Sequence, residues 1–141
     1  MPRVVVDPGV FVSALIAPKG TPAQLLDLLL EQRFELVVSP RLLAELTGVL
    51  LRDRFRRYVT AAEVRELVDD LAAVATVMRD PPDPVAITRD PNDDYLVALA
   101  LAAQVDALIS GDRDLTDLRD PPVSVLTPRT FLDRLSGFAE G

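Results

Sequence analysis

The chain has 141 residues, of which 49% are hydrophobic, and this is enough to fill the core of one domain spanning residues 1–141. Its formal net charge is −7, and it contains neither histidine nor cysteine, so imidazole and thiolate metal sites and histidine-based catalytic triads are excluded. Lys19 is the only lysine, and the sequence contains no glycine-rich phosphate-binding loop. Carboxylates, hydroxyls and arginines remain as the groups available for chemistry.

The first half of the chain alternates short apolar strands with capped helices. In chain order it predicts a strand at residues 3–7, helices at 8–16 and 21–33, a strand at 35–39 and a helix at 40–52. Thr21 with Gln24 has the spacing of a capping box, and Ser39 is positioned to cap the following helix. Residues 52–58 are a basic, aromatic connector.

The second half continues the same alternation. In chain order it predicts a helix at 60–74, a strand at 76–79, a proline-rich loop at 80–84, an unassigned stretch at 85–89, a helix at 90–103, a strand at 107–110, one helical turn at 115–118, a strand at 123–126 and a helix at 128–138. Thr60 with Glu63 forms a second capping box, and Thr127 caps the last helix. The pattern predicts an α/β fold, with a mostly parallel sheet of about four or five strands covered by helices on both faces.

The helix at 90–103 is apolar on every side, so we expect it to be buried, yet acids crowd its start. Asp7 follows the first strand, and Asp112 follows the strand at 107–110 by two residues. Because ligands bind beyond the carboxyl ends of parallel strands, Asp7, Asp94 and Asp112 are expected at one edge of the sheet. Carboxylates this close repel one another unless a cation lies among them, and oxygen ligands suit Mg²⁺ or Mn²⁺.

Each acid also has a structural interpretation. Asp7 has the position of an N-cap before Pro8, and Asp90 and Asp93 have capping-box spacing, which we take as their main role. Asp112 and Asp114 are typical of a turn, and Glu45 alone has the character of a solvated helix residue. Only Asp94 lacks such an explanation.

The connector offers two interpretations as well. Its arginines, with Arg52 and Arg56 as the candidates for substrate contact, could bind a single nucleic-acid strand together with Phe55 and Tyr58. The residues themselves slightly favour the other interpretation, in which these cations complement the C-terminus of the preceding helix.

Together these motifs resemble the PIN domain family, and in particular the VapC-like toxins of bacterial and archaeal toxin–antitoxin systems. Four segments carry the resemblance over nearly the whole chain: Val4–Ala14, Ser39–Leu46, Asp90–Ala103 and Leu108–Leu115. The chain departs from the family pattern at Pro8, which replaces the usual Thr or Ser after the first Asp and so removes a hydroxyl and a backbone donor.

The resemblance implies a three-layer Rossmann-like fold and an endoribonuclease that depends on Mg²⁺ or Mn²⁺. It implies that Asp7, Glu45, Asp94 and Asp112 hold the metal, that Asp114 supports it, and that Ser110 supplies a hydroxyl near the site. It also implies a homodimer and an antitoxin partner. No apolar run has the length of a membrane span and no signal peptide is evident, so we expect a cytoplasmic protein.

Two other functions compete with the nuclease. A catalytically inactive PIN-like interaction module would use the acids only as caps, and Pro8 and the sequence pI of about 4.5 support it. A phosphotransfer protein is disfavoured, because a phosphatase needs Asp-x-Asp after the first strand and a receiver domain needs a late lysine. The chain has Asp7-Pro8-Gly9 at the first position and only Lys19 for the second.

Overall fold

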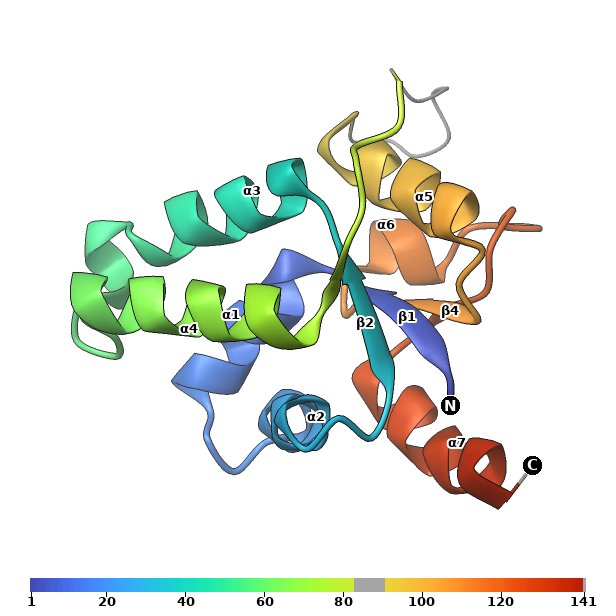
Figure 1. Cartoon of the computed structure of the whole chain (residues 1–141), viewed down its shortest axis with the longest axis horizontal. Coiled ribbons are helices and arrows are strands. Elements are labelled where there is room, and N and C mark those ends of the chain that lie inside the picture. Colours follow the sequence, from blue (N-terminus) through green and yellow to red (C-terminus); the bar gives the residue numbers. More distant parts are fainter. Residues whose placement is uncertain (83–90, 141) are drawn as a thin grey trace.

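The computed structural model describes residues 1–82 and 91–140 and shows a sheet with helices packed around it (Figure 1). In chain order its elements are β1 (Arg3–Val6), α1 (Pro8–Ile16), α2 (Thr21–Leu30), β2 (Glu35–Val38), α3 (Pro40–Leu50), the 3₁₀ turn η1 (Asp53–Phe55), α4 (Ala61–Val74), β3 (Thr76–Val77), α5 (Pro91–Ala103), β4 (Ala107–Ile109), α6 (Arg113–Thr116), β5 (Val125–Leu126) and α7 (Pro128–Glu140). The predicted cap Asp90 and the unassigned stretch 85–89 lie outside the described residues.

The five strands form one parallel sheet in the order β3-β2-β1-β4-β5, which confirms the predicted α/β fold. β1 lies in the centre, with β2 on one side and β4 on the other. The register pairs Val6 of β1 with Ile109 of β4, and the Asp7 N–H donates to the Ile109 carbonyl at 2.9 Å. The residues that follow β1 and β4 therefore leave the sheet side by side at its carboxyl edge.

The core explains why these short segments become strands. Val4, Val5 and Val6 are at most 1% exposed, and β2 and β4 are equally buried after their first residues. Continuous β-branched and aliphatic runs of this kind are typical of strands covered on both faces. In Figure 1, α5 lies on one side of the sheet, and α2 and α7 lie on the other.

The helix α5 is buried as predicted. Leu96, Leu99, Ala100 and Ala103 are at most 2% exposed, and the helix packs on the two central strands β1 and β4. Burial of these side chains fixes the position of its first turn over the carboxyl edge of the sheet. The one large exposed apolar side chain on the described part of α5 is Leu101.

The predicted caps are confirmed for Ser39, for Thr60 with Glu63, and for Thr127. The cap predicted at Thr21 is wrong, because Gly20 takes the extended N-cap conformation and Thr21 is already the first helical residue. The helical turn predicted at 115–118 begins earlier, at Arg113, because Asp112 caps it. The outer strands β3 and β5 are also shorter than predicted.

Within the described residues, no helix combines the length and apolar composition needed to cross a bilayer.

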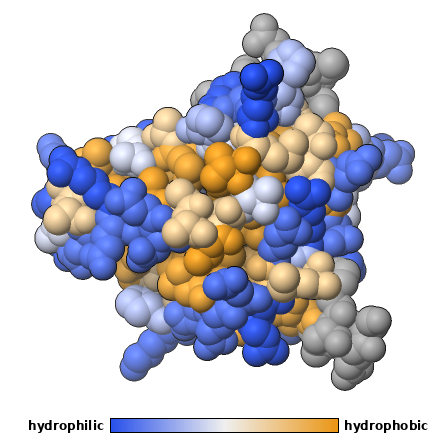
Figure 2. All heavy atoms as spheres, viewed as in Figure 1, coloured by the Kyte–Doolittle hydropathy of each residue, from blue (hydrophilic) through white to orange (hydrophobic). Residues whose placement is uncertain are grey.

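Figure 2 shows apolar side chains gathered in the middle of one face, over α1, α4 and β2, with hydrophilic side chains around them. Val77 of the edge strand β3 is 51% exposed.

Candidate metal centre

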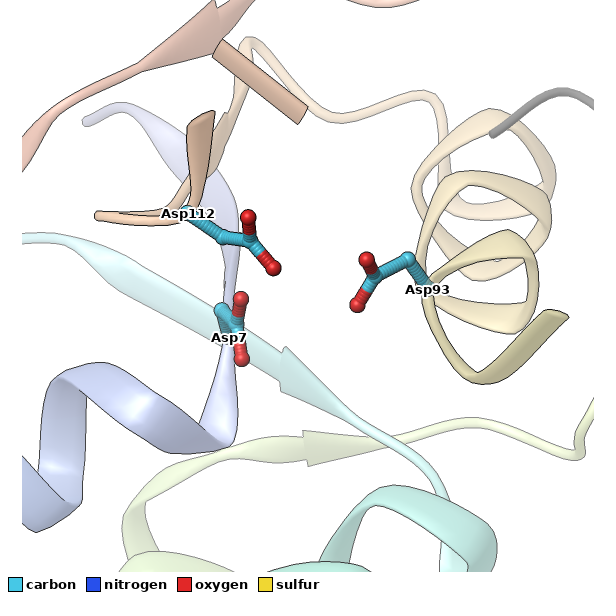
Figure 3. A group of neighbouring side chains, drawn as sticks. All are labelled: Asp7, Asp93 and Asp112. Atoms are coloured by element: carbon cyan, nitrogen blue, oxygen red, sulfur yellow. The ribbon is translucent and has the colours of Figure 1, made fainter. Parts of the chain in front are cut away.

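Three carboxylates from distant parts of the chain meet at the carboxyl edge of the sheet. Asp7 follows β1, Asp112 follows β4, and Asp93 lies in the first turn of α5. One oxygen from each residue lies within 4.8 Å of the other two. Figure 3 shows the three side chains pointing toward one another from these separate elements. The pairing of β1 with β4 thus brings Asp7 and Asp112, which are more than a hundred positions apart in the sequence, close to each other.

Ser110 connects two of these acids. Its side chain is fully buried, and its hydroxyl donates to Asp7 Oδ2 at 2.8 Å while accepting from the Asp112 N–H at 3.0 Å. Because Ser110 directly follows β4, its hydroxyl fixes both the carboxylate after β1 and the backbone that leads to Asp112. The hydroxyl predicted near the site therefore lies there and orients the acids.

Asp7 is held through both of its carboxylate oxygens. Oδ1 accepts from the Gly9 N–H at 3.0 Å, which makes Asp7 the N-cap of α1, and Oδ2 accepts from Ser110. Burial raises the pKa of Asp7 above its ordinary value of 3.8; the Gly9 and Ser110 hydrogen bonds oppose this shift, and the charge of Asp112 adds to it. Removal from water is therefore the dominant effect on the Asp7 carboxylate.

Asp112 and Asp114 lie in the turn that follows Ser110. Asp112 Oδ1 accepts from the Asp114 N–H at 2.9 Å and caps α6. The turn interpretation of this segment is thus correct for its backbone, and it leaves the second Asp112 oxygen available to the site. The Asp114 carboxylate is exposed and does not belong to the group of three.

Glu45 borders the group without joining it. It lies half-buried on α3, and its Oε2 accepts a hydrogen bond from the hydroxyl of Tyr95 on α5. The pKa of Tyr95 is raised far above its ordinary value, mainly by burial. The hydrogen bond to Glu45, the charge of Glu45 and the charge of Asp7 raise it further. Tyr95 was not singled out from the sequence as a site residue. An aromatic hydroxyl in the otherwise aliphatic stretch 95–103 was the available signal.

A pocket of about 290 Å³ opens beside the acids. It is lined by Asp7, Gly9, Val10, Ser13, Pro22, Asp93, Gly111, Asp112 and Pro128. Residues in the first turns of α1, α2 and α7 thus line the pocket together with the carboxylates.

Comparison with known proteins places this site in a family. The family model described as "PIN domain" matches residues 3–114, which contain all the acids discussed above. The chain belongs to the PIN domain family.

The PIN domain has relatives among curated proteins and solved structures. It is 29% identical to the uncharacterized protein MJ1680 of Methanocaldococcus jannaschii, over 96% of this chain and 93% of that one. It resembles the crystal structure of PAE2754 from Pyrobaculum aerophilum, with a TM-score of 0.65, 15% identity, and coverage of 97% and 90%. It also resembles VapBC2 from Rickettsia felis bound to a fragment of promoter DNA, with a TM-score of 0.60, 14% identity, and coverage of 89% and 98%. At these identities the two structures show a shared fold.

The acid that α5 contributes differs from the one predicted. The sequence pointed to Asp94 as the ligand and to Asp93 as a capping residue, whereas the structure brings Asp93 to Asp7 and Asp112. Asp94 is only 4% exposed and lies outside this group. The physical reason is the rotation of α5, since adjacent residues on a helix point about 100° apart.

The arginines of the connector lie at the C-terminal end of α3, whereas Ser39 at its N-terminal end marks the carboxyl edge of the sheet. Arg56 donates to the carbonyls of Leu51 and Val59, at 2.8 and 3.4 Å, and so closes the end of the helix. Arg52 is exposed. These contacts agree with the interpretation that the cations complement a helix C-terminus.

The residues of this site fit a divalent cation. All three grouped side chains offer carboxylate oxygens, which are the hard ligands that Mg²⁺ and Mn²⁺ prefer. Two of them are pre-oriented by hydrogen bonds with Ser110 and Gly9, so little reorganisation is needed on binding. Mutual repulsion of three close carboxylates also favours a cation among them.

Proposed function

We propose that this PIN domain is an endoribonuclease that depends on Mg²⁺ or Mn²⁺ and hydrolyses phosphodiester bonds in RNA. The observation that carries the proposal is the convergence of Asp7, Asp93 and Asp112 at the carboxyl edge of the sheet, beside an open pocket. Membership of the PIN family supports nuclease chemistry. The absence of histidine leaves the carboxylates as the groups able to organise such a site.

Each residue has a role in this proposal. Asp7, Asp93 and Asp112 hold the cation, and Ser110 orients the first and last of them. When bound, a divalent cation lowers the pKa of a coordinated water and stabilises negative charge on a phosphate. Glu45 adds negative charge at the border of the site and orients solvent there.

Residues further from the carboxylates have weaker support. Asp114 acts on Asp112 through its backbone N–H, and Asp94 supports the start of α5 from within the core. Arg52 remains a candidate contact for a longer RNA strand, because its side chain is exposed. Arg56 contributes there only by shaping the connector.

We further propose that the protein acts as a cytoplasmic toxin with a cognate antitoxin and that it forms a homodimer. The structural likeness to VapBC2, together with the resemblance of the four sequence motifs to VapC-like toxins, supports this assignment. Co-expression with the product of an adjacent open reading frame, followed by co-purification, tests for the antitoxin, and sedimentation equilibrium tests for the dimer.

The competing function is a PIN-like interaction module without catalysis. One observation favours it: Asp7 and Asp112 both serve as N-caps, of α1 and α6, so each has a structural use without any metal. Capping does not explain why Asp93 points at these two residues, and for this reason the nuclease is preferred.

Cleavage of single-stranded RNA decides between these functions. Purified protein is incubated with labelled RNA in Mg²⁺, in Mn²⁺ and in EDTA, alongside Asp7→Asn and Asp93→Asn. Asp27→Asn, an exposed charge change on α2, is the matched control. The nuclease predicts metal-dependent cleavage that both site variants lose and the control keeps. Folded protein that binds no metal and leaves RNA intact would contradict the nuclease and favour the interaction module.

A further inference from the structure

Tyr95 joins two helices that carry acids of the proposed site. It follows Asp93 by two residues on α5, is 4% exposed, and its hydroxyl donates to Glu45 Oε2 on α3. α3 is itself anchored at its start, where the Ser39 hydroxyl accepts from the Leu42 N–H and the Asp80 carboxylate accepts from the Arg41 N–H. Both ends of the Tyr95–Glu45 contact are therefore held by fixed elements.

The charges around the Tyr95 hydroxyl come from the site. Glu45 and Asp7 lie close enough to act on it, and the Arg41 guanidinium stacks over its ring, 4.3 Å from the centroid. A phenol carries its proton at neutral pH and a carboxylate only accepts, so Tyr95 is the donor and Glu45 the acceptor of this bond. Its acceptor is the Glu45 carboxylate, which does not belong to the group of Asp7, Asp93 and Asp112.

We propose that Tyr95 is a positioning residue that fixes the Glu45 carboxylate at the border of the metal centre. Glu45 has three rotatable side-chain bonds, and the Tyr95 hydroxyl is the donor that holds its carboxylate in one orientation. The hydrogen bond holds that charge where it adds to the field of Asp7, Asp93 and Asp112. This inference rests on the proposed function, because it gives Glu45 its use in a divalent cation site.

The test compares two substitutions that remove the same atom. Tyr95→Phe deletes the hydroxyl that Glu45 accepts, and Tyr58→Phe deletes the hydroxyl of the other tyrosine in the chain, which accepts from Arg57 on the connector. Mn²⁺ affinity is measured by calorimetry and RNA cleavage by initial rates, each also in Glu45→Gln and in the double variant Tyr95→Phe/Glu45→Gln.

We expect Tyr95→Phe to weaken Mn²⁺ binding and cleavage by about tenfold, the lower end of the effect typical of groups just outside a metal's coordination sphere. Tyr58→Phe leaves the Mn²⁺ affinity unchanged, because the Tyr58 hydroxyl accepts a hydrogen bond from Arg57 on the connector. Because Tyr95 acts through Glu45, the double variant matches Glu45→Gln alone, whereas two independent residues would give additive losses.

A spectroscopic measurement keeps the test independent of how well Tyr95→Phe folds. The chain has no tryptophan, so in Tyr58→Phe the remaining tyrosine dominates the near-ultraviolet circular dichroism at its absorption band. Mg²⁺ is expected to change this signal when Glu45 is present and to leave it unchanged in Tyr58→Phe/Glu45→Gln.

The inference is overturned while the nuclease stands if Tyr95→Phe binds Mn²⁺ and cleaves RNA as well as the wild type, or if the losses of the two substitutions add in the double variant. A near-ultraviolet circular dichroism signal of Tyr95 that does not change when Mg²⁺ is added to active protein also overturns the inference. Wild-type protein that neither binds Mn²⁺ nor cleaves RNA overturns the proposed function, and the inference with it.

Discussion

Asp93 and Asp94 are adjacent acids in the first turn of α5, yet they occupy different environments. Asp93 reaches toward Asp7 and Asp112, whereas Asp94 is buried at 4% exposure and lies outside the group. The geometry of a helix separates them by about 100° around its axis. Substitution of each in turn therefore separates the proposed metal ligand Asp93 from an acid that is buried outside the group.

Asp93→Asn is predicted to weaken Mn²⁺ binding by at least about tenfold, since it removes one of three charged ligands. Asp94→Asn is predicted to change Mn²⁺ affinity by less than about threefold and to lower the melting temperature, because its side chain lies in the core. Calorimetric titration and thermal melting in EDTA measure the two effects. Equal losses of affinity in both variants would show that both acids serve the metal.

The charged Asp7 carboxylate is predicted to lower the free energy of unfolding of the metal-free protein at neutral pH. Its folded-state pKa is raised above 3.8, so the stability associated with its protonation is present below pH 3.8 and is lost as the pH rises through the folded value. At neutral pH, Asp7→Asn in EDTA should therefore melt a few degrees higher than wild type, at about 2–4 °C per kcal/mol.

Two conditions check the sign of this effect. The difference between Asp7→Asn and wild type should shrink as the pH falls toward 3.8, where the wild-type carboxyl becomes neutral. Mn²⁺ at a concentration that saturates the wild type should reverse the order, because the wild type then gains more binding energy than the variant. An Asp7→Asn variant that melts lower than wild type in EDTA at every pH contradicts the raised pKa.

The helix α5 places Asp93 by packing on β1 and β4. Leu99→Ala is predicted to lower the free energy of unfolding by about 2–5 kcal/mol, because Leu99 is fully buried in this contact. Leu101→Ala makes the same chemical change on the same helix at a side chain that is 44% exposed, and should cost less than about 0.5 kcal/mol. Urea denaturation measures both, and equal costs would mean that α5 is not packed as described.

The elements themselves were predictable because their signals are local. Continuous valines predict the buried strand β1, and Ser39 and Thr60 mark helix starts that the structure confirms. The parallel sheet followed from the alternation of strands and helices, and with it the meeting of Asp7 and Asp112. None of these steps required knowledge of how one helix is rotated against the sheet.

The rotation of α5 was not predictable for the same kind of reason. Apolar residues surround this helix, so periodicity carries no sign of which side faces the strands, and the choice of Asp94 over Asp93 was made without that information. The contact between Tyr95 and Glu45 depends on the relative placement of α3 and α5, which no local pattern encodes. The cap predicted at Thr21 was wrong for a simpler reason. Thr21 and Gln24 have capping-box spacing, and the sequence does not show that the N-cap is the preceding residue, Gly20.

The whole molecule combines a net charge of −7 with a proposed anionic substrate. RNA would be repelled by such a chain unless cations lie where the strand binds. The structure concentrates three acids at one edge of the sheet, beside an open pocket, where a divalent ion would reverse the local field. Metal binding and substrate binding are therefore expected to depend on each other.

Anomalous scattering from crystals grown with Mn²⁺ tests this arrangement most directly. We expect an anomalous difference peak for one Mn²⁺ ion coordinated by carboxylate oxygens of Asp7, Asp93 and Asp112. Crystals of Asp112→Asn at the same Mn²⁺ concentration should show no such peak. Ordered side chains with no peak among them at saturating Mn²⁺, or a peak bound only at other residues, would contradict it.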